Sequence, residues 1–447
     1  MTGPDDRGEG VASRLALAPP KGMRDLLPPA STARARLREK LVHAFRLFGY
    51  ERVTTPPFEH AEVLERGIET VDPRELMRFV EPDTGEVALL RPDLTPQIAR
   101  IIATRLANRP PPWRLCYEGT VIRRRHGRAR QQRQIFQAGV ECVGLEGPRA
   151  DAEVVRVAAT ACARVGLPEH HFELAQVRLG QAALAAVPEA ARPLAQEAMS
   201  RKDGFALEGV LRNAGVPARA RRAPLKLIEL FGDRQTIGRA RRAFRDAASQ
   251  EALDELEAVV DRLEGAGLGE RLGIDLGEVR GQAYYTGVSV TLLAPGPGAA
   301  IGTGGRYDRL LGRFGAPAPA TGFAFDVDNL EWALRHAGVE TTGRTNPRFV
   351  LVAADADLEA EALARALRAK GYATSRVFGP GTDAGIAYAK AWDYDIVIAR
   401  ERRGWQATRV GGDAASAHLE GGDAELLGRL LEWADAAHAT KELACPQ

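Results

Sequence analysis

Five polar side chains of complementary types follow one another between residues 93 and 141. They are Asp93, Thr95, Arg123, Gln137 and Glu141. A free amino acid presents an ammonium, a carboxylate and a side chain, so its site needs an anion, a cation and a shaped polar wall. Asp93 could meet the ammonium with help from Thr95 and Gln137, and Arg123 could meet the carboxylate through a charge-assisted fork. These residue types predict a small-molecule site of mixed charge.

Other kinds of chemistry lack their residue patterns in this sequence. None of the eight histidines has the spacing of a metal site, and the adjacent His170 and His171 point in different directions in any regular element. The run Gly302-Thr303-Gly304-Gly305 is not followed by the Lys-Ser/Thr pair of a phosphate-binding loop, so we interpret it as a tight strand entry. The sequence therefore predicts no metal, no cofactor and no catalytic triad.

The hydrophobic pattern predicts the elements that would position these residues. A first helix, capped by Ser31, has an apolar face formed by Leu37, Leu41, Phe45 and Phe48. A strand is expected over Tyr50–Thr55, where Pro56-Pro57 ends it. Further strands are predicted at Val87–Leu90, Trp113–Tyr117, Gln134–Glu141, Ala283–Leu293 and Thr321–Val327, and helices at Thr95–Leu106 and Ala152–Val165.

The chain is expected to divide into a large core and a small second domain. Residues 1–18 would form a flexible tail, and residues 19–336 a core with a helical insertion at about 181–270. Residues 337–347, which read AGVETTGRTNP, are typical of a linker. Beyond them, strands at 348–353, 372–377 and 394–399 alternate with helices at 357–371, 383–391 and 423–437. This alternation predicts a small α/β domain over residues 348–440.

Length, composition and charge limit the classes of protein that fit. The 447 residues exceed the roughly 100–200 of one ordinary domain, and 45% hydrophobic with 27% charged residues is typical of globular proteins. The net charge of +2 leaves no strongly basic footprint, so nucleic acid is not an expected partner. No stretch approaches the roughly 20 apolar residues of a membrane span. Four cysteines without a CxxC pair, and an acidic N-terminus unlike a secretory signal, predict a cytoplasmic location.

Ordered motifs between Lys21 and Leu330 resemble the histidyl-tRNA synthetase family, and class II synthetase cores generally. In order, they are Lys21-Gly22-Met23-Arg24-Asp25, Arg91-Pro92-Asp93-Leu94-Thr95, Tyr117-Glu118-Gly119 with Arg123, Gln137 with Gly139-Val140-Glu141, Arg280-Gly281-Gln282-Ala283-Tyr284-Tyr285, and Gly304-Gly305-Arg306-Tyr307-Asp308. Asp93 and Leu94 stand where synthetases normally have Glu and Gly. In this detail the chain is most similar to the regulatory subunit of ATP phosphoribosyltransferase, a paralogue that acts in histidine biosynthesis without aminoacylation.

The resemblance implies an α+β fold: a class II synthetase-like antiparallel sheet flanked by helices, with the helical insertion and the C-terminal α/β domain. It implies a non-catalytic subunit whose partner is a short-form ATP phosphoribosyltransferase catalytic subunit and whose effector is L-histidine. It also implies a homodimer, paired through the first helix and the strand that ends at Pro56. A divergent histidyl-tRNA synthetase and a histidine-sensing paralogue with another partner are the alternatives. The C-terminal domain favours the synthetase, because it resembles a degenerate anticodon-binding domain that regulatory subunits often lack.

The resemblance assigns histidine-binding roles to the matching positions. They are Asp93, Thr95, Arg123, Gln137, Glu141, Arg280, Tyr284, Tyr285 and Tyr307. Glu141 and Tyr285 would hydrogen-bond the two nitrogens of an imidazole, and Tyr307 would close the wall. Arg280 matches a synthetase residue that assists activation; here it could bind a carboxylate or phosphate, or be a surface residue at a strand entry.

The positions that bind ATP in the family are altered in this sequence. The Glu that contacts adenine falls at Arg125, and the aromatic residue falls near Ile135, with Phe136 shifted by one residue. The last motif has other residues where the family has Gly, Glu and Arg, namely Asp326, Asp328 and Asn329. Since removal of one preorganised contact commonly lowers a rate by ~10²–10³, the resemblance predicts no activation of histidine.

Six arginines lie between Arg123 and Arg133, in the predicted hairpin. They could contact an anion or nucleic acid, form a solvated hairpin tip, or contribute to a protein interface, where Arg is enriched. The sequence leaves these three interpretations open.

Overall fold

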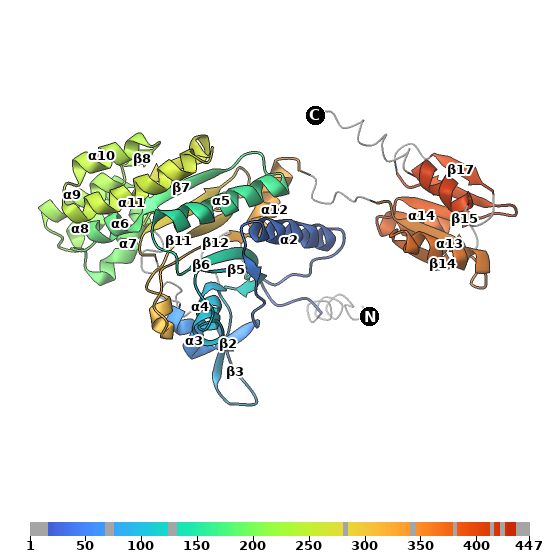
Figure 1. The fold of residues 1–447 in the computed structure, drawn as a ribbon, viewed down its shortest axis with the longest axis horizontal. Coiled ribbons are helices and arrows are strands. Elements are labelled where there is room, and N and C mark those ends of the chain that lie inside the picture. Colours follow the sequence, from blue (N-terminus) through green and yellow to red (C-terminus); the bar gives the residue numbers. More distant parts are fainter. Residues whose placement is uncertain are drawn as a thin grey trace, which may run out of the picture. The chain divides into compact units, whose positions relative to one another are not determined.

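The computed structural model describes residues 17–67, 76–123, 132–279, 285–339, 346–378, 382–411, 415–420 and 425–434. The chain forms two compact units (Figure 1). The core unit comprises residues 1–26 and 34–341, and the C-terminal unit comprises residues 27–33 and 342–447. Most of the predicted tail, residues 1–16, and most of the predicted linker, residues 340–345, lie outside the described residues.

A nine-stranded sheet forms the centre of the core unit. Its order is β1 (Glu51–Arg52), β5 (Trp113–Ile122), β6 (Gln134–Val143), β12 (Ala320–Asp326), β11 (Gly302–Arg306), β10 (Val288–Leu293), β7 (His171–Gln176), β9 (Leu272–Asp275) and β8 (Phe231–Gly232). The pairs β1–β5 and β7–β9 are parallel, and the other neighbours are antiparallel. The predicted antiparallel sheet is therefore confirmed, with a parallel pair near each edge that the sequence pattern did not indicate.

Helices cover both faces of this sheet and bury two separate apolar clusters. On one face the main cluster contains residues from α2 (Ala30–Arg46), α5 (Pro148–Val165), α11 (Ala247–Glu264) and α12 (Val327–His336). The predicted apolar face of α2 is confirmed, since Leu37, Leu41 and Phe45 are buried there. On the other face Ile98 and Ile102 of α4 (Thr95–Arg105) pack against β5 and β6. Figure 1 shows that strands far apart in the sequence, such as β6 and β12, lie side by side in this sheet.

The predicted helical block is present but is not free of strands. It contains α6 (Val177–Ala183), α7 (Arg192–Ser200), α8 (Gly204–Asn213), α9 (Ala218–Leu227), α10 (Gln235–Ala243) and α11. Asp203 and Asp246 cap α8 and α11 by accepting hydrogen bonds from backbone N–H groups. The two-residue strand β8 pairs with β9 and was missed, because two residues show no alternation.

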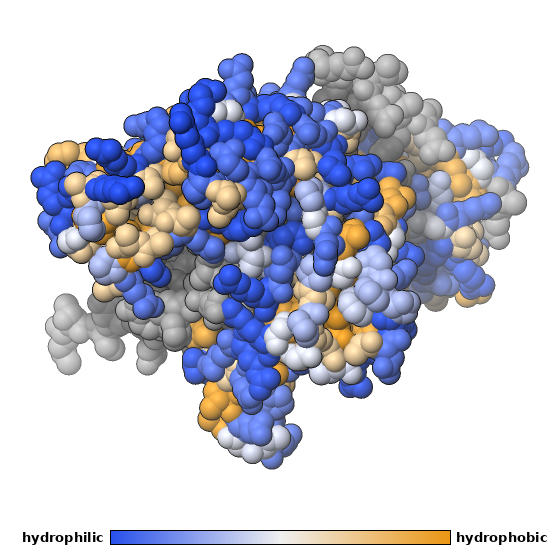
Figure 2. Space-filling view, turned by 60° about the vertical axis from the view of Figure 1, so that its left-hand side comes forward, coloured by the Kyte–Doolittle hydropathy of each residue, from blue (hydrophilic) through white to orange (hydrophobic). Residues whose placement is uncertain are grey.

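A small three-stranded sheet projects from the core unit. Its order is β2 (Phe58–His60), β4 (Val87–Leu90) and β3 (Met77–Val80), and α3 (Ala61–Gly67) packs against it. Only β4 was predicted from the sequence. Phe58, Val80 and Val87 are exposed, and Figure 2 shows apolar side chains on this projection of an otherwise largely hydrophilic surface.

The C-terminal unit has its own five-stranded sheet, in the order β14 (Thr374–Phe378), β13 (Phe349–Ala353), β15 (Ile396–Arg400), β16 (Trp405–Arg409) and β17 (Ser416–Leu419). The predicted strands β13, β14 and β15 are confirmed and run parallel, with α13 (Leu358–Ala369) and α14 (Thr382–Ala391) between them. The antiparallel strands β16 and β17 were not predicted. Among the described residues of the chain, no helix is long and apolar enough to cross a membrane.

A buried ion-pair cluster fixes the end of β11 to the start of α5. The Arg306 guanidinium lies 3.0 Å from carboxylates of both Asp151 and Asp308, and it donates to the carbonyl of Gly147 at 2.9 Å. Arg306 and Asp151 are both buried. Because Tyr307 follows Arg306 directly, this cluster also fixes the position of a predicted site residue.

We predict that Arg306→Met strongly destabilises the core unit. Removing one partner of a buried pair leaves Asp151 without compensation, which typically costs 3–5 kcal/mol. Urea unfolding of the full chain measures this loss. Arg201→Met removes an exposed helical pair with Glu197 and should change stability by less than about 0.5 kcal/mol. Equal effects of the two substitutions would contradict the prediction.

Candidate functional site

The carboxyl of Glu141 is the centre of a cluster of hydroxyl groups on the α4 face of the sheet. Its Oε1 atom accepts hydrogen bonds from Thr95 Oγ1 at 2.7 Å and from the Tyr117 hydroxyl at 3.1 Å. Its Oε2 atom accepts a hydrogen bond from the Tyr307 hydroxyl. Glu141, Tyr117 and Tyr307 are buried. Three of the predicted site residues therefore meet here, and Tyr117 joins them although it was not among the predicted site residues.

Glycines on neighbouring strands make room for these side chains. Tyr117 pairs with Gly139 across β5 and β6, and a Cβ at Gly139 would lie 2.7 Å from the Tyr117 hydroxyl oxygen. Glu141 pairs with Gly322 across β6 and β12, and a Cβ at Gly322 would lie 1.7 Å from Glu141 Oε2. Both distances are far below van der Waals contact, so the ring and the carboxyl lie flat over strand backbone that carries no side chain.

Burial raises the pKa of Glu141 to about 8. The hydrogen bonds from Tyr307, Thr95 and Tyr117 act in the opposite direction, because they stabilise the carboxylate, whereas the nearby charge of Asp93 raises the pKa further. The pKa of Tyr285 is also raised, first by burial and then by Asp93 and Glu141. The site therefore holds a carboxyl whose charge changes near neutral pH.

Asp93 and Arg123 face each other at the mouth of this cluster. Arg123 Nη2 lies 3.3 Å from Asp93 Oδ2, and Arg123 Nε donates to the carbonyl of Pro92. Asp93 Oδ1 accepts from the backbone N–H of Leu94 at 2.7 Å, at the start of α4. Both charged side chains are partly exposed, so the predicted anion and cation lie together and within reach of solvent.

Gln137 carries a buried acceptor without a hydrogen-bond partner in the described part of the chain. This atom is Oε1, and the side chain lies four residues before Glu141 on β6, on the same face of the sheet. Tyr285 packs in the same cluster, beside Gly305, whose φ of +146° is a conformation that favours glycine. Arg280 and Tyr284, also predicted site residues, lie outside the described residues, as does Arg125.

Arg91 positions the loop before α4. Its guanidinium donates to the carbonyls of Thr120 at 2.8 Å and Thr55 at 2.9 Å, and to Thr55 Oγ1 at 2.8 Å. The side chain is buried and lies over Gly119, where a Cβ would meet Nη2 at 2.3 Å. Arg91 therefore ties β5 and the segment after β1 to the segment that carries Asp93 and Thr95.

Described residues at the positions that the family resemblance links to ATP have structural partners in this chain. Asp326 caps α12, because its carboxylate accepts from the backbone N–H of Asn329 at 3.0 Å. Asn329 is buried and donates to the carbonyl of Ala300 at 2.8 Å. Ile135 lies in the cluster on the Glu141 face, whereas Phe136 packs on the other face, with its ring centroid 4.8 Å from the Arg38 guanidinium carbon. The shift by one residue therefore places the Phe136 ring on the face of the sheet opposite Glu141.

Asp328 connects the motif at Lys21–Asp25 to the sheet. Its carboxylate accepts from the backbone N–H of Phe136 at 2.9 Å and from Arg34 at 2.6 Å, and Arg24 of that motif also pairs with it. The carbonyl of Gly22 accepts a hydrogen bond from the backbone N–H of Arg133 at 2.9 Å. The carbonyl of Arg133 in turn accepts one from the backbone N–H of Arg123. The motif therefore braces the base of the β5–β6 hairpin, one end of which carries Arg123.

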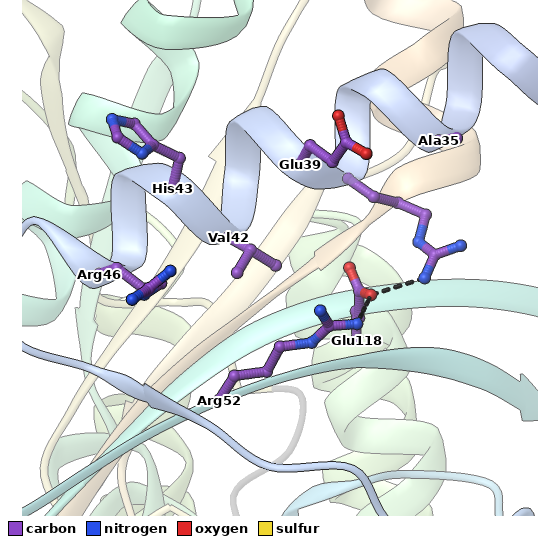
Figure 3. Close-up of a pocket in the computed structure, with 8 residues that line it drawn as sticks. Ala35, Glu39, Val42, His43, Arg46, Arg52 and Glu118 are labelled. Carbon is purple, nitrogen blue, oxygen red and sulfur yellow. Dashed lines mark hydrogen bonds and ion pairs between the residues drawn. The ribbon is translucent and has the colours of Figure 1, made fainter.

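A separate groove of about 460 Å³ lies along α2, on the opposite face of β5 from Glu141 (Figure 3). It is lined by Ala35, Arg38, Glu39, Val42, His43, Arg46, Arg52 and Glu118. Glu118 pairs with Arg38 at 2.6 Å and also with Arg52. None of the predicted site residues that the structure describes lines this groove, so we treat it as a surface distinct from the Glu141 site.

We predict that Glu141 makes stability pH-dependent. In the folded state the pKa of Glu141 is about 8, above the ordinary value near 4.3. The folded state therefore holds this proton more tightly than the unfolded state at pH values between the two. Stability should therefore fall as pH rises from about 5 to 8, by at most ~1.4 kcal/mol per pH unit. Urea unfolding at several pH values should show a shallower slope for Glu141→Gln; an unchanged slope would refute the assignment.

Comparisons with known proteins identify the family of the chain. The family model described as histidyl-tRNA synthetase matches residues 22–330. The ATP phosphoribosyltransferase regulatory subunit of Anaeromyxobacter dehalogenans 2CP-1 is 45% identical over 325 residues, which are 72% of this chain and 92% of that protein. The protein of the same name from Geobacter sulfurreducens is 36% identical over 374 residues, 83% of this chain and 85% of that protein.

Solved structures share the fold. A structure from Bacillus halodurans, titled as an ATP phosphoribosyltransferase regulatory subunit/histidyl-tRNA synthetase, has a TM-score of 0.74 at 28% identity, covering 86% of this chain and 98% of that one. Histidyl-tRNA synthetase from Nostoc sp. PCC 7120 has the same TM-score at 19% identity, covering 93% and 99%, and shows the fold alone. The predicted class II synthetase-like fold is confirmed, and this chain belongs to the family of ATP phosphoribosyltransferase regulatory subunits, which share the histidyl-tRNA synthetase fold.

Proposed function

We propose that this chain is the non-catalytic regulatory subunit of an ATP phosphoribosyltransferase. We also propose that it binds histidine, the end product of histidine biosynthesis, at the Glu141 site. The observation that carries the proposal is the hydroxyl-bound carboxyl of Glu141 beside the Asp93–Arg123 pair, in a chain 45% identical to a regulatory subunit. The partner is a short-form catalytic subunit, which joins ATP to phosphoribosyl pyrophosphate. The chain therefore acts in the first step of histidine biosynthesis.

The groups of the site match the groups of histidine. Asp93 and the buried oxygen of Gln137 accept from the ammonium, with Thr95 beside them, and Arg123 holds the carboxylate. Glu141 and Tyr285 hydrogen-bond the ring nitrogens, and Tyr307 closes the wall. Arg280 and Tyr284 belong to the same sequence motif as Tyr285, and they complete the proposed set of contacts with histidine.

The structural partners of Asp326 and Asn329 support the proposal that the chain does not activate an amino acid. Asn329 cannot neutralise a phosphate, and its amide is bound to Ala300. Asp326 places a carboxylate at the start of α12, where the synthetase pattern has glycine. ATP is therefore left to the partner subunit.

Feedback inhibition requires that histidine binds more tightly to one arrangement of the hetero-oligomer than to another. A ligand with equal affinity for both arrangements would shift nothing. A coupling of 1–3 kcal/mol corresponds to roughly 5–150-fold control of the partner. Reciprocity then demands that the partner's substrates weaken histidine binding by the same factor.

We predict that the chain makes a short-form catalytic subunit active and sensitive to histidine. The measurement is partner turnover with and without this chain across a histidine titration. Arg123→Ala removes the carboxylate fork, so the titration should shift to about 10–100-fold higher histidine. Arg201→Ala, an exposed arginine in α7–α8, is the matched control and should leave the titration unchanged.

Two results would contradict this function. A partner that is fully active and histidine-inhibited alone would remove the regulatory role. Histidine-dependent pyrophosphate exchange by the purified chain, at the rate of ordinary synthetases, would place it with the catalytic synthetases.

We also propose that the core is a homodimer paired along α2 and β1. The groove beside α2 supports this, because Ala35, Glu39 and His43 form an exposed stripe at helical spacing beside the edge strand β1 (Figure 3).

Cytoplasmic location is proposed from the described cysteines, Cys116, Cys142 and Cys162, which are buried and unpaired.

Light scattering of the isolated chain should give the mass of a dimer at micromolar concentration. Ala35→Glu adds charge and bulk to the groove and should shift the mass toward a monomer. Lys40→Glu changes an exposed residue of the same helix outside the groove lining and should leave the mass unchanged. A monomeric mass for the natural sequence would rule out this proposal.

A further inference from the structure

The hydrogen bonds of Glu141 can be counted atom by atom. An ionised carboxylate offers about four acceptor positions, two on each oxygen. Thr95 and Tyr117 fill both positions on Oε1, and Tyr307 fills one on Oε2. Among the described residues, therefore, one acceptor position is left, and it is on Oε2.

We propose that Tyr117 is a positioning residue of the site: its hydroxyl completes Oε1 of Glu141 and so leaves a single acceptor, on Oε2, for a ring N–H of the ligand. The inference rests on the proposed binding of histidine and extends it to specificity. A ligand with a ring N–H donates a hydrogen bond to the remaining acceptor position on Oε2 of Glu141. A ring of the same shape without that donor leaves this position unpaired in a buried site.

The orientation of the carboxyl is set by the sheet and not by the ligand. The absence of side chains at Gly139 and Gly322 lets Tyr117 and Glu141 lie across neighbouring strands, in the register of β5, β6 and β12. The charged and titratable groups that act on Glu141 from the other elements are Asp93 at the α4 side, and Tyr285 and Tyr307 beside β10 and β11, while Arg123 acts on Tyr285. Each of these groups remains when Tyr117 is changed.

The experiment is calorimetric titration of the full chain with histidine from pH 6 to 9, repeated with β-(2-thiazolyl)alanine, whose ring lacks an N–H. The natural sequence should bind histidine better as Glu141 ionises and should discriminate strongly against the analogue. Tyr117→Phe removes a donor to the carboxylate, so the pH midpoint of histidine binding should move upward. Affinity should fall on the order of tenfold, and discrimination against the analogue should narrow.

Tyr50→Phe is the matched control. Tyr50 is also a buried tyrosine whose hydroxyl donates to a carboxylate, that of Glu153 at 3.1 Å, but it lies in the cluster on the other face of the sheet. The Tyr50→Phe variant should lose about as much stability as Tyr117→Phe. It should keep the pH midpoint of histidine binding and the discrimination against the analogue that the natural sequence shows. A Tyr117→Phe chain with the midpoint and discrimination of the natural sequence overturns the inference, whatever its stability.

A second pair of variants tests Oε1 if Tyr117→Phe does not fold. Thr95→Val removes the other donor to Oε1 and should raise the midpoint, whereas Thr95→Ser keeps the hydroxyl and should not. Equal midpoints for these two variants overturn the inference. Absence of histidine binding by the natural sequence would instead remove the proposed ligand and this inference together, so the two failures are distinguishable.

Discussion

A carboxyl group buried inside a sheet is the constraint on which the core of this protein depends. Three hydroxyls stabilise Glu141 from different elements: the start of α4, strand β5 and the segment after β11. Each hydroxyl fixes one of those elements relative to β6. The glycines at 139 and 322 are the counterpart, since any side chain there would displace the ring or the carboxyl. A slip of one residue in either strand pair would therefore lose both the hydrogen bonds and the space.

The same arrangement explains what could be predicted from the sequence. The residue types of Asp93, Arg123 and Glu141 indicated a site of mixed charge, because those types carry their chemistry wherever they are placed. Tyr117 was overlooked, because its role depends on being paired with Gly139, and cross-strand register is not a local property. Strands β16 and β17 were missed for the same reason, since they are defined by neighbours that lie elsewhere in the chain. Helices such as α2 and α13 followed from their own periodicity.

The chain is longer than one of its relatives and contains two separate apolar cores. The Anaeromyxobacter protein is covered over 92% of its length by 72% of this chain, so it is the shorter of the two. The C-terminal unit has a separate apolar core, in which Phe349, Leu351 and Trp405 are buried. A separate core lets a domain be gained or lost without repacking its neighbour. The described residues of the Glu141 site all belong to the core unit.

The start of α12 also bears on how such a chain could change over evolutionary time. Asp326 caps the helix, Asp328 joins β6 to two arginines, and Asn329 is bonded to Ala300. These three positions are the ones at which the synthetase pattern has Gly, Glu and Arg. A single exchange toward that pattern at 326 would remove a cap, and one at 329 would place a long cation where a buried amide is now paired. Each such exchange would destabilise α12 by itself, so the present residues at these positions restrict which substitutions the chain can accept one at a time.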